Sequence, residues 1–103
     1  MRNFKKVTFI FALLICQHSM AKDVTKEIIS YCRTEMGEYG ASIVKACVDE
    51  EIRALKALNK YPSKYKTIVS RCMADMREFG FMTVKACVDE DIEAENALSK
   101  YER

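Results

Sequence analysis

Cysteine is the residue type with the clearest chemistry in this chain. Four of the five cysteines form two pairs with the same spacing, with fourteen residues between Cys32 and Cys47 and fourteen between Cys72 and Cys87. Structural zinc sites usually space paired ligands roughly two to four residues apart, and haem attachment and thiol-redox motifs use Cys-x-x-Cys. The spacing therefore favours two disulfides, and we expect no metal site, no cofactor and no reactive thiol.

The start of the chain, 1–21, has the order of a secretory signal peptide. A basic beginning is followed by an apolar run over 7–16, and Ser19 and Ala21 place small residues where signal peptidase cuts. The apolar run is shorter than the roughly 20 residues that span a bilayer. We therefore expect cleavage after Ala21, a secreted or periplasmic location and no stable membrane span afterwards; an uncleaved signal anchor is the alternative.

Loss of this segment changes the charge of the chain. The whole sequence has 17 Lys and Arg against 15 Asp and Glu, and the segment carries three of the basic residues and no acidic one, which leaves 14 against 15. A phosphate-binding surface needs a basic excess or stripe, so we expect no nucleic acid partner. The four remaining cysteines are an even number, as is typical of disulfide-bonded proteins in oxidising compartments.

The rest of the chain contains an internal duplication. Ile28 to Tyr61 aligns without gaps with Ile68 to Tyr101, and 19 of 34 positions are identical. The match is densest at Val-Lys-Ala-Cys-Val-Asp-Glu, which occurs at 44–50 and again at 84–90. A period of about 40 residues is typical of two-helix repeats. The predicted organisation is a signal peptide, 1–21, a first hairpin repeat, 22–61, and a second hairpin repeat, 62–103.

Each copy has the apolar spacing of two helices separated by a glycine. Apolar residues recur at helical intervals before and after Gly40 in the first copy and Gly80 in the second. Glycine ends helices readily because it adopts left-handed backbone conformations without steric cost. Pro62 separates the copies, since proline cannot continue a helix. The sequence predicts an all-α fold of two tandem disulfide-stapled helical hairpins packed as a small four-helix domain, with a stacked, solenoid-like pair as the alternative.

The central glycines explain the cysteine spacing. Cys32 lies eight residues before Gly40 and Cys47 lies seven after it, so at about 1.5 Å per residue both lie at one height on antiparallel helices. The second pair has the same offsets from its own glycine. In general form this arrangement resembles the twin-cysteine hairpins of small mitochondrial intermembrane-space proteins, whose cysteines are more closely spaced. We expect one disulfide inside each hairpin, joining Cys32 to Cys47 and Cys72 to Cys87.

Acidic runs are a second recurring feature. Asp49-Glu50-Glu51 and Asp89-Glu90-Asp91 lie within helical patterns, in which consecutive side chains point about 100 degrees apart and do not converge on one ion. We therefore expect solvated helix faces rather than a cation site. In the first copy, Asp49 and Arg53 have the spacing of a favourable surface ion pair.

The residues around Gly80 differ from those around Gly40. Phe81 and Met82 follow Gly80 where the first copy has Ala41 and Ser42, and Phe79 precedes it. These side chains either close the helix end by a local contact or form an exposed apolar tip that docks a partner. The candidate partner-binding residues are Phe79, Phe81 and Met82.

No catalytic constellation is evident in the sequence. The only histidine, His18, lies within the expected signal peptide, so the commonest general base is missing from the mature chain. The sequence predicts a small exported, non-catalytic protein-interaction module whose partner is another protein or a second copy of itself. The alternative is a small-ligand or lipid-binding helical bundle with a cavity between the two hairpins.

Overall fold

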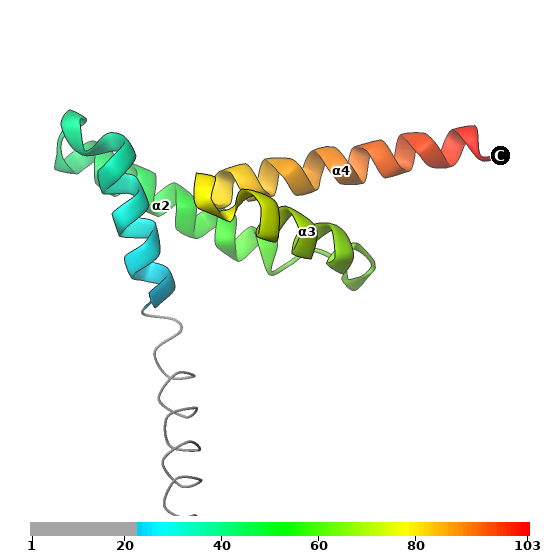
Figure 1. Ribbon diagram of the computed structural model, residues 1–103, viewed down its shortest axis with the longest axis horizontal. Coiled ribbons are helices and arrows are strands. Elements are labelled where there is room, and N and C mark those ends of the chain that lie inside the picture. The colour runs from blue at the N-terminus through cyan, green and yellow to red at the C-terminus, as the bar shows by residue number, and fades with distance from the viewer. Residues whose placement is uncertain (1–22) are drawn as a thin grey trace, which may run out of the picture.

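The computed structural model describes residues 23–103, which are helical almost throughout (Figure 1). The first helix covers 23–36, and the later helices are α2, Ala41–Leu58, α3, Lys66–Met76, and α4, Phe81–Tyr101. Short 3-10 turns lie at Gly37–Tyr39, Ser63–Tyr65 and Arg77–Phe79. This part of the chain contains no strand, and the predicted all-α fold is confirmed. The predicted signal peptide, 1–21, lies outside the described residues.

A glycine marks the turn of each hairpin, as predicted. Gly40 has φ 97° and Gly80 has φ 95°, and the next residue begins α2 or α4. Side chains rarely tolerate a positive φ, so these two positions require glycine. Each glycine N–H donates to a carbonyl three residues back, Gly40 to Gly37 at 3.2 Å and Gly80 to Arg77 at 3.1 Å. The chain therefore reverses direction within a tight, hydrogen-bonded turn.

Each hairpin is closed by its own disulfide, which confirms the predicted pairing. Cys32 bonds Cys47 and Cys72 bonds Cys87, and both pairs have a Cα–Cα distance of 5.8 Å. Cys32 and Cys72 are fully buried within the apolar cluster. Two disulfides indicate an oxidising environment, since cytosolic thiols are kept reduced. Within residues 23–103, no helix combines the length and apolar character needed to cross a membrane.

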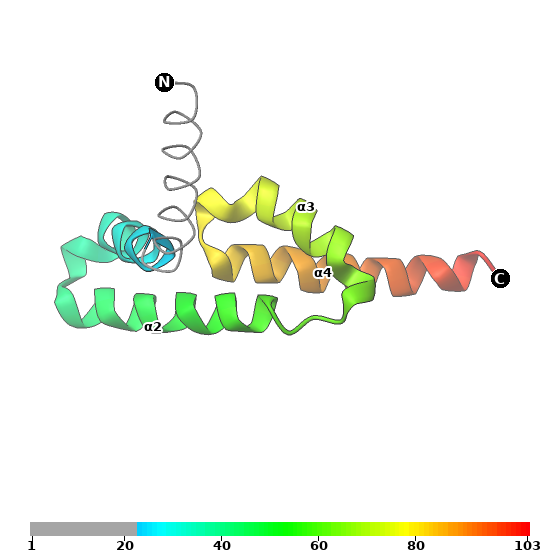
Figure 2. The same ribbon diagram turned by 90° about the horizontal axis from the view of Figure 1, so that it is seen from below.

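The two hairpins pack against each other with a stagger along their long axes. The C-terminal half of α2 lies beside the N-terminal half of α4, and α3 packs along α4 on another side (Figures 1 and 2). Ala54 and Leu58 of α2 share one buried cluster with Val84 and Val88 of α4. The four helices are thus in contact, as predicted. Because of the stagger, the last turns of α4 extend beyond α3 (Figure 2).

Candidate interaction site at the hairpin junction and on α4

The turn of the second hairpin docks against the first hairpin. Phe81, the first residue of α4, is 2% exposed and belongs to one buried cluster with Ile28 of the first helix and Ala54 of α2. The Phe81 backbone N–H donates a hydrogen bond to the carboxylate of Glu51 in α2. The first hairpin therefore holds the second through both its side chain and its backbone.

Glu51 provides the acceptor at this junction. Its side chain is only 3% exposed, so the predicted solvated face is wrong at this position. The first N–H groups of a helix have no partner within the helix and form its positive end, so a carboxylate is favoured there. Glu51 supplies that carboxylate to α4 from the other hairpin. Asp49 and Glu50 are exposed, as predicted.

A bidentate ion pair fixes the edge of the junction. Arg77 donates from Nε to Glu27 Oε2 at 2.9 Å and from its terminal nitrogen to Oε1 at 2.7 Å. These hydrogen bonds hold the pKa of Glu27 below its usual value. The Arg77 guanidinium also lies 5.5 Å from the centroid of the Phe81 ring. Since the pair is partly exposed, we assign it to orientation rather than to a large share of the stability.

The residues that enter the junction from the second copy have no equivalents in the first. When the two copies are aligned, Gly37 stands in place of Arg77 and Ala41 in place of Phe81. The first hairpin therefore presents a small turn without the aromatic side chain and without the guanidinium. At this junction, the second copy inserts its turn and the first copy receives it.

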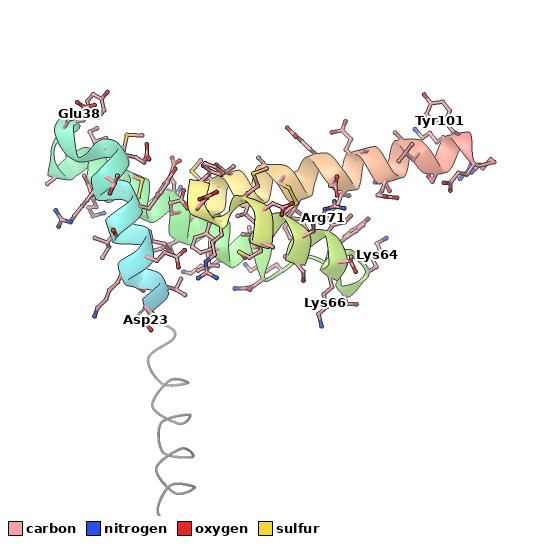
Figure 3. The ribbon with its side chains drawn as sticks, viewed as in Figure 1. Asp23, Glu38, Lys64, Lys66, Arg71 and Tyr101 are labelled. Atoms are coloured by element: carbon pink, nitrogen blue, oxygen red, sulfur yellow. A yellow bond between two sulfur atoms is a disulfide. The ribbon has the colours of Figure 1, made fainter. Side chains whose placement is uncertain are left out.

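The receiving residues are also specific to one copy. The ring of Tyr31 lies beside Gly80, so Tyr31 receives the second turn together with Glu51. These two residues of the first copy correspond to Arg71 and Asp91 of the second. Arg71 and Asp91 form an ion pair with each other, between α3 and α4 (Figure 3). In the second hairpin, Arg71 and Asp91 therefore pair with each other. The residues at the same positions of the first hairpin contact the other hairpin instead.

The predicted partner-binding residues are divided between the surface and the interior. Phe79 and Met82 are exposed, and their role in binding stays a prediction. Phe81 is buried at the junction, so the expected exposed tip is wrong for this residue. The physical reason is that the first hairpin provides an apolar site for Phe81 within the same chain.

The surface ion pairs also differ in part from the expected pattern. Asp49 forms its contact ion pair with Lys45 at 2.8 Å, and the charge of Arg53, the predicted partner, also helps to lower the pKa of Asp49 after the Lys45 hydrogen bond. The second copy repeats this arrangement, with Lys85 and Asp89 at 2.7 Å. Both pairs lie on the recurring heptapeptide and have exposed side chains. The same charged surface therefore occurs once on α2 and once on α4.

A stripe on α2 and the segment after it forms the contact with α4. Leu58 is 4% exposed, and the Tyr61 hydroxyl donates a hydrogen bond to Asp89. Burial of the hydroxyl, with the hydrogen bond to Asp89, raises the pKa of Tyr61 to about 12. Ala54 and Ala57 line a groove with Met82 and Lys85. We name this surface the inner stripe: Ala54, Ala57, Leu58 and Tyr61.

The same four residue types recur on α4, where all four are exposed. Ala94, Ala97, Leu98 and Tyr101 align with the inner stripe when the two copies are superposed in sequence, and we name them the outer stripe. Leu98 is 51% exposed and Tyr101 is 86% exposed. Tyr101 lies at the free end of α4, away from the hairpin junction (Figure 3). The same four residue types are therefore buried or half-buried in the first copy and exposed in the second.

The outer stripe and Glu51 were not predicted as site residues. The duplication carried a signal for both, because all four stripe residues are identical in the two copies while the junction residues differ. The sequence alone does not show which copy of the stripe is covered. The stagger of the two hairpins decides this.

A small pocket lies where the hairpins meet. It is bordered by Glu27, Tyr31, Glu51 and Phe81, and its cavity volume is about 80 Å³. Pockets for drug-sized ligands have volumes of roughly 300–1,000 Å³. This pocket has room for a few water molecules. Among residues 23–103, no cluster of side chains is arranged to hold a metal ion.

The fold and its interfaces define a small disulfide-stapled helical-repeat protein. Comparison of the chain with protein-family models, with curated proteins and with solved structures finds no match.

Proposed function

We propose that this protein is an exported, non-catalytic interaction module that binds another protein through the outer stripe. The observation that carries the proposal is the exposure of Leu98 and Tyr101, whose counterparts Leu58 and Tyr61 hold two helices together. Exposed apolar side chains grouped on one helix face are typical of binding surfaces.

The inner stripe indicates what kind of partner the outer stripe would bind. The inner stripe lies against α4, which offers Met82, the stem of Lys85 and the carboxylate of Asp89 as acceptor for the tyrosine hydroxyl. An outer-stripe partner would therefore be a helix that offers aliphatic side-chain atoms, such as a lysine stem, and a carboxylate near one end. Such a helix would cover Leu98 and accept the Tyr101 hydrogen bond.

The proposed location follows from the cysteines together with the start of the sequence. The two disulfides support an oxidising compartment. The basic and apolar start with small residues before the cut supports export by a cleaved signal, to the periplasm or to the outside. The binding module would then act beyond the cytoplasmic membrane.

Site-specific photo-cross-linking in the producing cells tests this function. A photoreactive residue at position 98 is expected to give a covalent adduct with a protein, because this position lies on the outer stripe. The matched control is position 96, which is exposed on the opposite side of α4. Absence of an adduct from position 98, or equal yields from both positions, would contradict the proposal.

A further inference from the structure

We propose that the partner of the outer stripe is a second copy of this chain, bound head to tail through the N-terminal half of its α2. This inference rests on the proposed function and names the occupant of the same surface. Its basis is that the chain already contains one example of the interface, between its own two copies.

The surface that receives the inner stripe is itself duplicated. On α4 it includes Lys85 and Asp89, and the corresponding residues on α2 are Lys45 and Asp49, within the same heptapeptide. Lys45, Asp49 and the preceding Ser42 are exposed. The Lys45–Asp49 pair at 2.8 Å repeats the Lys85–Asp89 pair at 2.7 Å. Asp49 therefore has the same lysine partner as Asp89, which accepts the hydrogen bond of Tyr61.

Each chain therefore has one uncovered half of the interface at each end. The outer stripe lies on the last turns of α4, beyond α3, and the free receiving surface lies on the first turns of α2, at the far end of the molecule (Figure 2). When two identical units pack head to tail, the stripe of the first unit contacts the receiving surface of the second. The receiving surface of the first unit and the stripe of the second unit then stay uncovered. A second copy covers both kinds of surface, with Tyr101 of one chain donating to Asp49 of the next.

The contact between chains lacks some of the contacts inside the chain. Ala41 and Gly37 replace the inserting Phe81 and Arg77, so neither the buried ring nor the bidentate ion pair is reproduced. Ser42 stands in place of Met82, so the aliphatic side chain that lines the groove beside Ala54 and Ala57 is missing as well. The smaller turn also needs less room beside the Arg71–Asp91 pair. We therefore expect the association to be weak and reversible, with a dissociation constant on the order of micromolar to millimolar.

The geometry of the contact decides the kind of assembly. The two contacting surfaces are different, so the interface is heterologous, and such interfaces build open chains or closed rings. A two-fold dimer that joins two outer stripes would be a different assembly. A change on α2 would weaken the head-to-tail contact but would not affect a dimer that joins two outer stripes.

Sedimentation velocity of the mature, oxidised protein over a range of concentrations tests the inference. The average mass is expected to rise with concentration. Leu98→Glu and Ser42→Glu should each weaken the association by about tenfold or more. The first puts a charge in place of an apolar side chain of the outer stripe, and the second puts a charge against that stripe from the α2 side. Ser42 lies in the first turn of α2, where a glutamate favours the helix, so unfolding does not explain a loss. Asn96→Glu, exposed on the opposite side of α4, is the matched control and should leave the association unchanged.

Mixing the two variants gives the sharpest result. Leu98→Glu retains the receiving surface and Ser42→Glu retains the outer stripe, so the mixture is expected to form a one-to-one dimer that grows no further. Two outcomes would overturn the inference: a monomer at all concentrations up to the millimolar range, or association by Ser42→Glu equal to that of the unmodified chain. A monomer that still cross-links another protein from position 98 would leave the proposed function standing, whereas no adduct at all would remove both.

Discussion

Reduction of both disulfides is expected to unfold residues 23–103 at room temperature. Each bond closes a loop of about 16 residues, and the chain-entropy model assigns about 3 kcal/mol to such a loop. Small domains have a total stability of roughly 5–15 kcal/mol. Of the nine apolar residues that are buried within 23–103, two are disulfide cysteines, so the remaining core is small. The two bonds together therefore supply a large part of the free energy of unfolding.

Far-UV circular dichroism with and without reductant measures this effect. The oxidised protein should be helical with a cooperative thermal transition, and the reduced protein should lose most of both. Equal helix content and an equal melting temperature in the two states would contradict the expectation. Replacement of all four cysteines by alanine provides a second form of the reduced state without added thiol.

The two disulfides should not contribute equally. The first helix diverges from α2, whereas α3 lies close along α4 and is also joined to it by the Arg71–Asp91 pair (Figure 1). Less of the first helix therefore lies alongside α2 than of α3 alongside α4 (Figure 1). We expect the Cys32→Ala/Cys47→Ala variant to have a lower melting temperature than the Cys72→Ala/Cys87→Ala variant.

Gly80→Ala is expected to destabilise the protein more than Gly40→Ala. Both glycines have a positive φ, so either substitution carries backbone strain of about 1–3 kcal/mol. At Gly80 a Cβ would also lie 2.6 Å from Glu51 Oε1 and 2.9 Å from the Tyr31 ring, whereas a Cβ at Gly40 meets nothing within 4 Å. Such overpacking adds about 1–3 kcal/mol and acts on the hairpin junction.

Chemical denaturation of the two glycine variants under identical conditions separates strain from packing. The backbone strain is common to both, so the difference in unfolding free energy reports the contacts of the Gly80 Cβ with the first hairpin. A difference of about 1–3 kcal/mol, with Gly80→Ala the less stable, is expected. Equal stabilities would show that the second turn does not pack against Glu51 and Tyr31 in solution.

The hairpins and their disulfides could be predicted because their determinants are local. Helical periodicity, a glycine at the turn and cysteines equidistant from it all act within a single copy of the repeat. The docking of one hairpin on the other could not be predicted in the same way. Phe81 beside Gly80 is equally compatible with an exposed tip and with a buried contact, and only the position of the first hairpin decides between them.

Glu51 and the outer stripe show the same limit. Within an acidic run, the helical pattern does not distinguish Glu51 from Glu50. Glu51 is buried because the first turn of α4, from the other hairpin, packs against it. Leu58 and Leu98 have the same residue type at equivalent positions of the two copies. They differ in exposure because Leu58 shares the buried cluster with residues of α4, whereas Leu98 lies outside that cluster among residues 23–103.

The inner stripe is covered within the chain, whereas the identical outer stripe is exposed. Hydroxyl-radical footprinting of the dilute, oxidised protein measures this for each side chain separately. Leu98 and Tyr101 are expected to be oxidised much faster than Leu58 and Tyr61, in accord with exposures of 51% for Leu98 and 4% for Leu58. Equal rates of oxidation at the two stripes would contradict the claim.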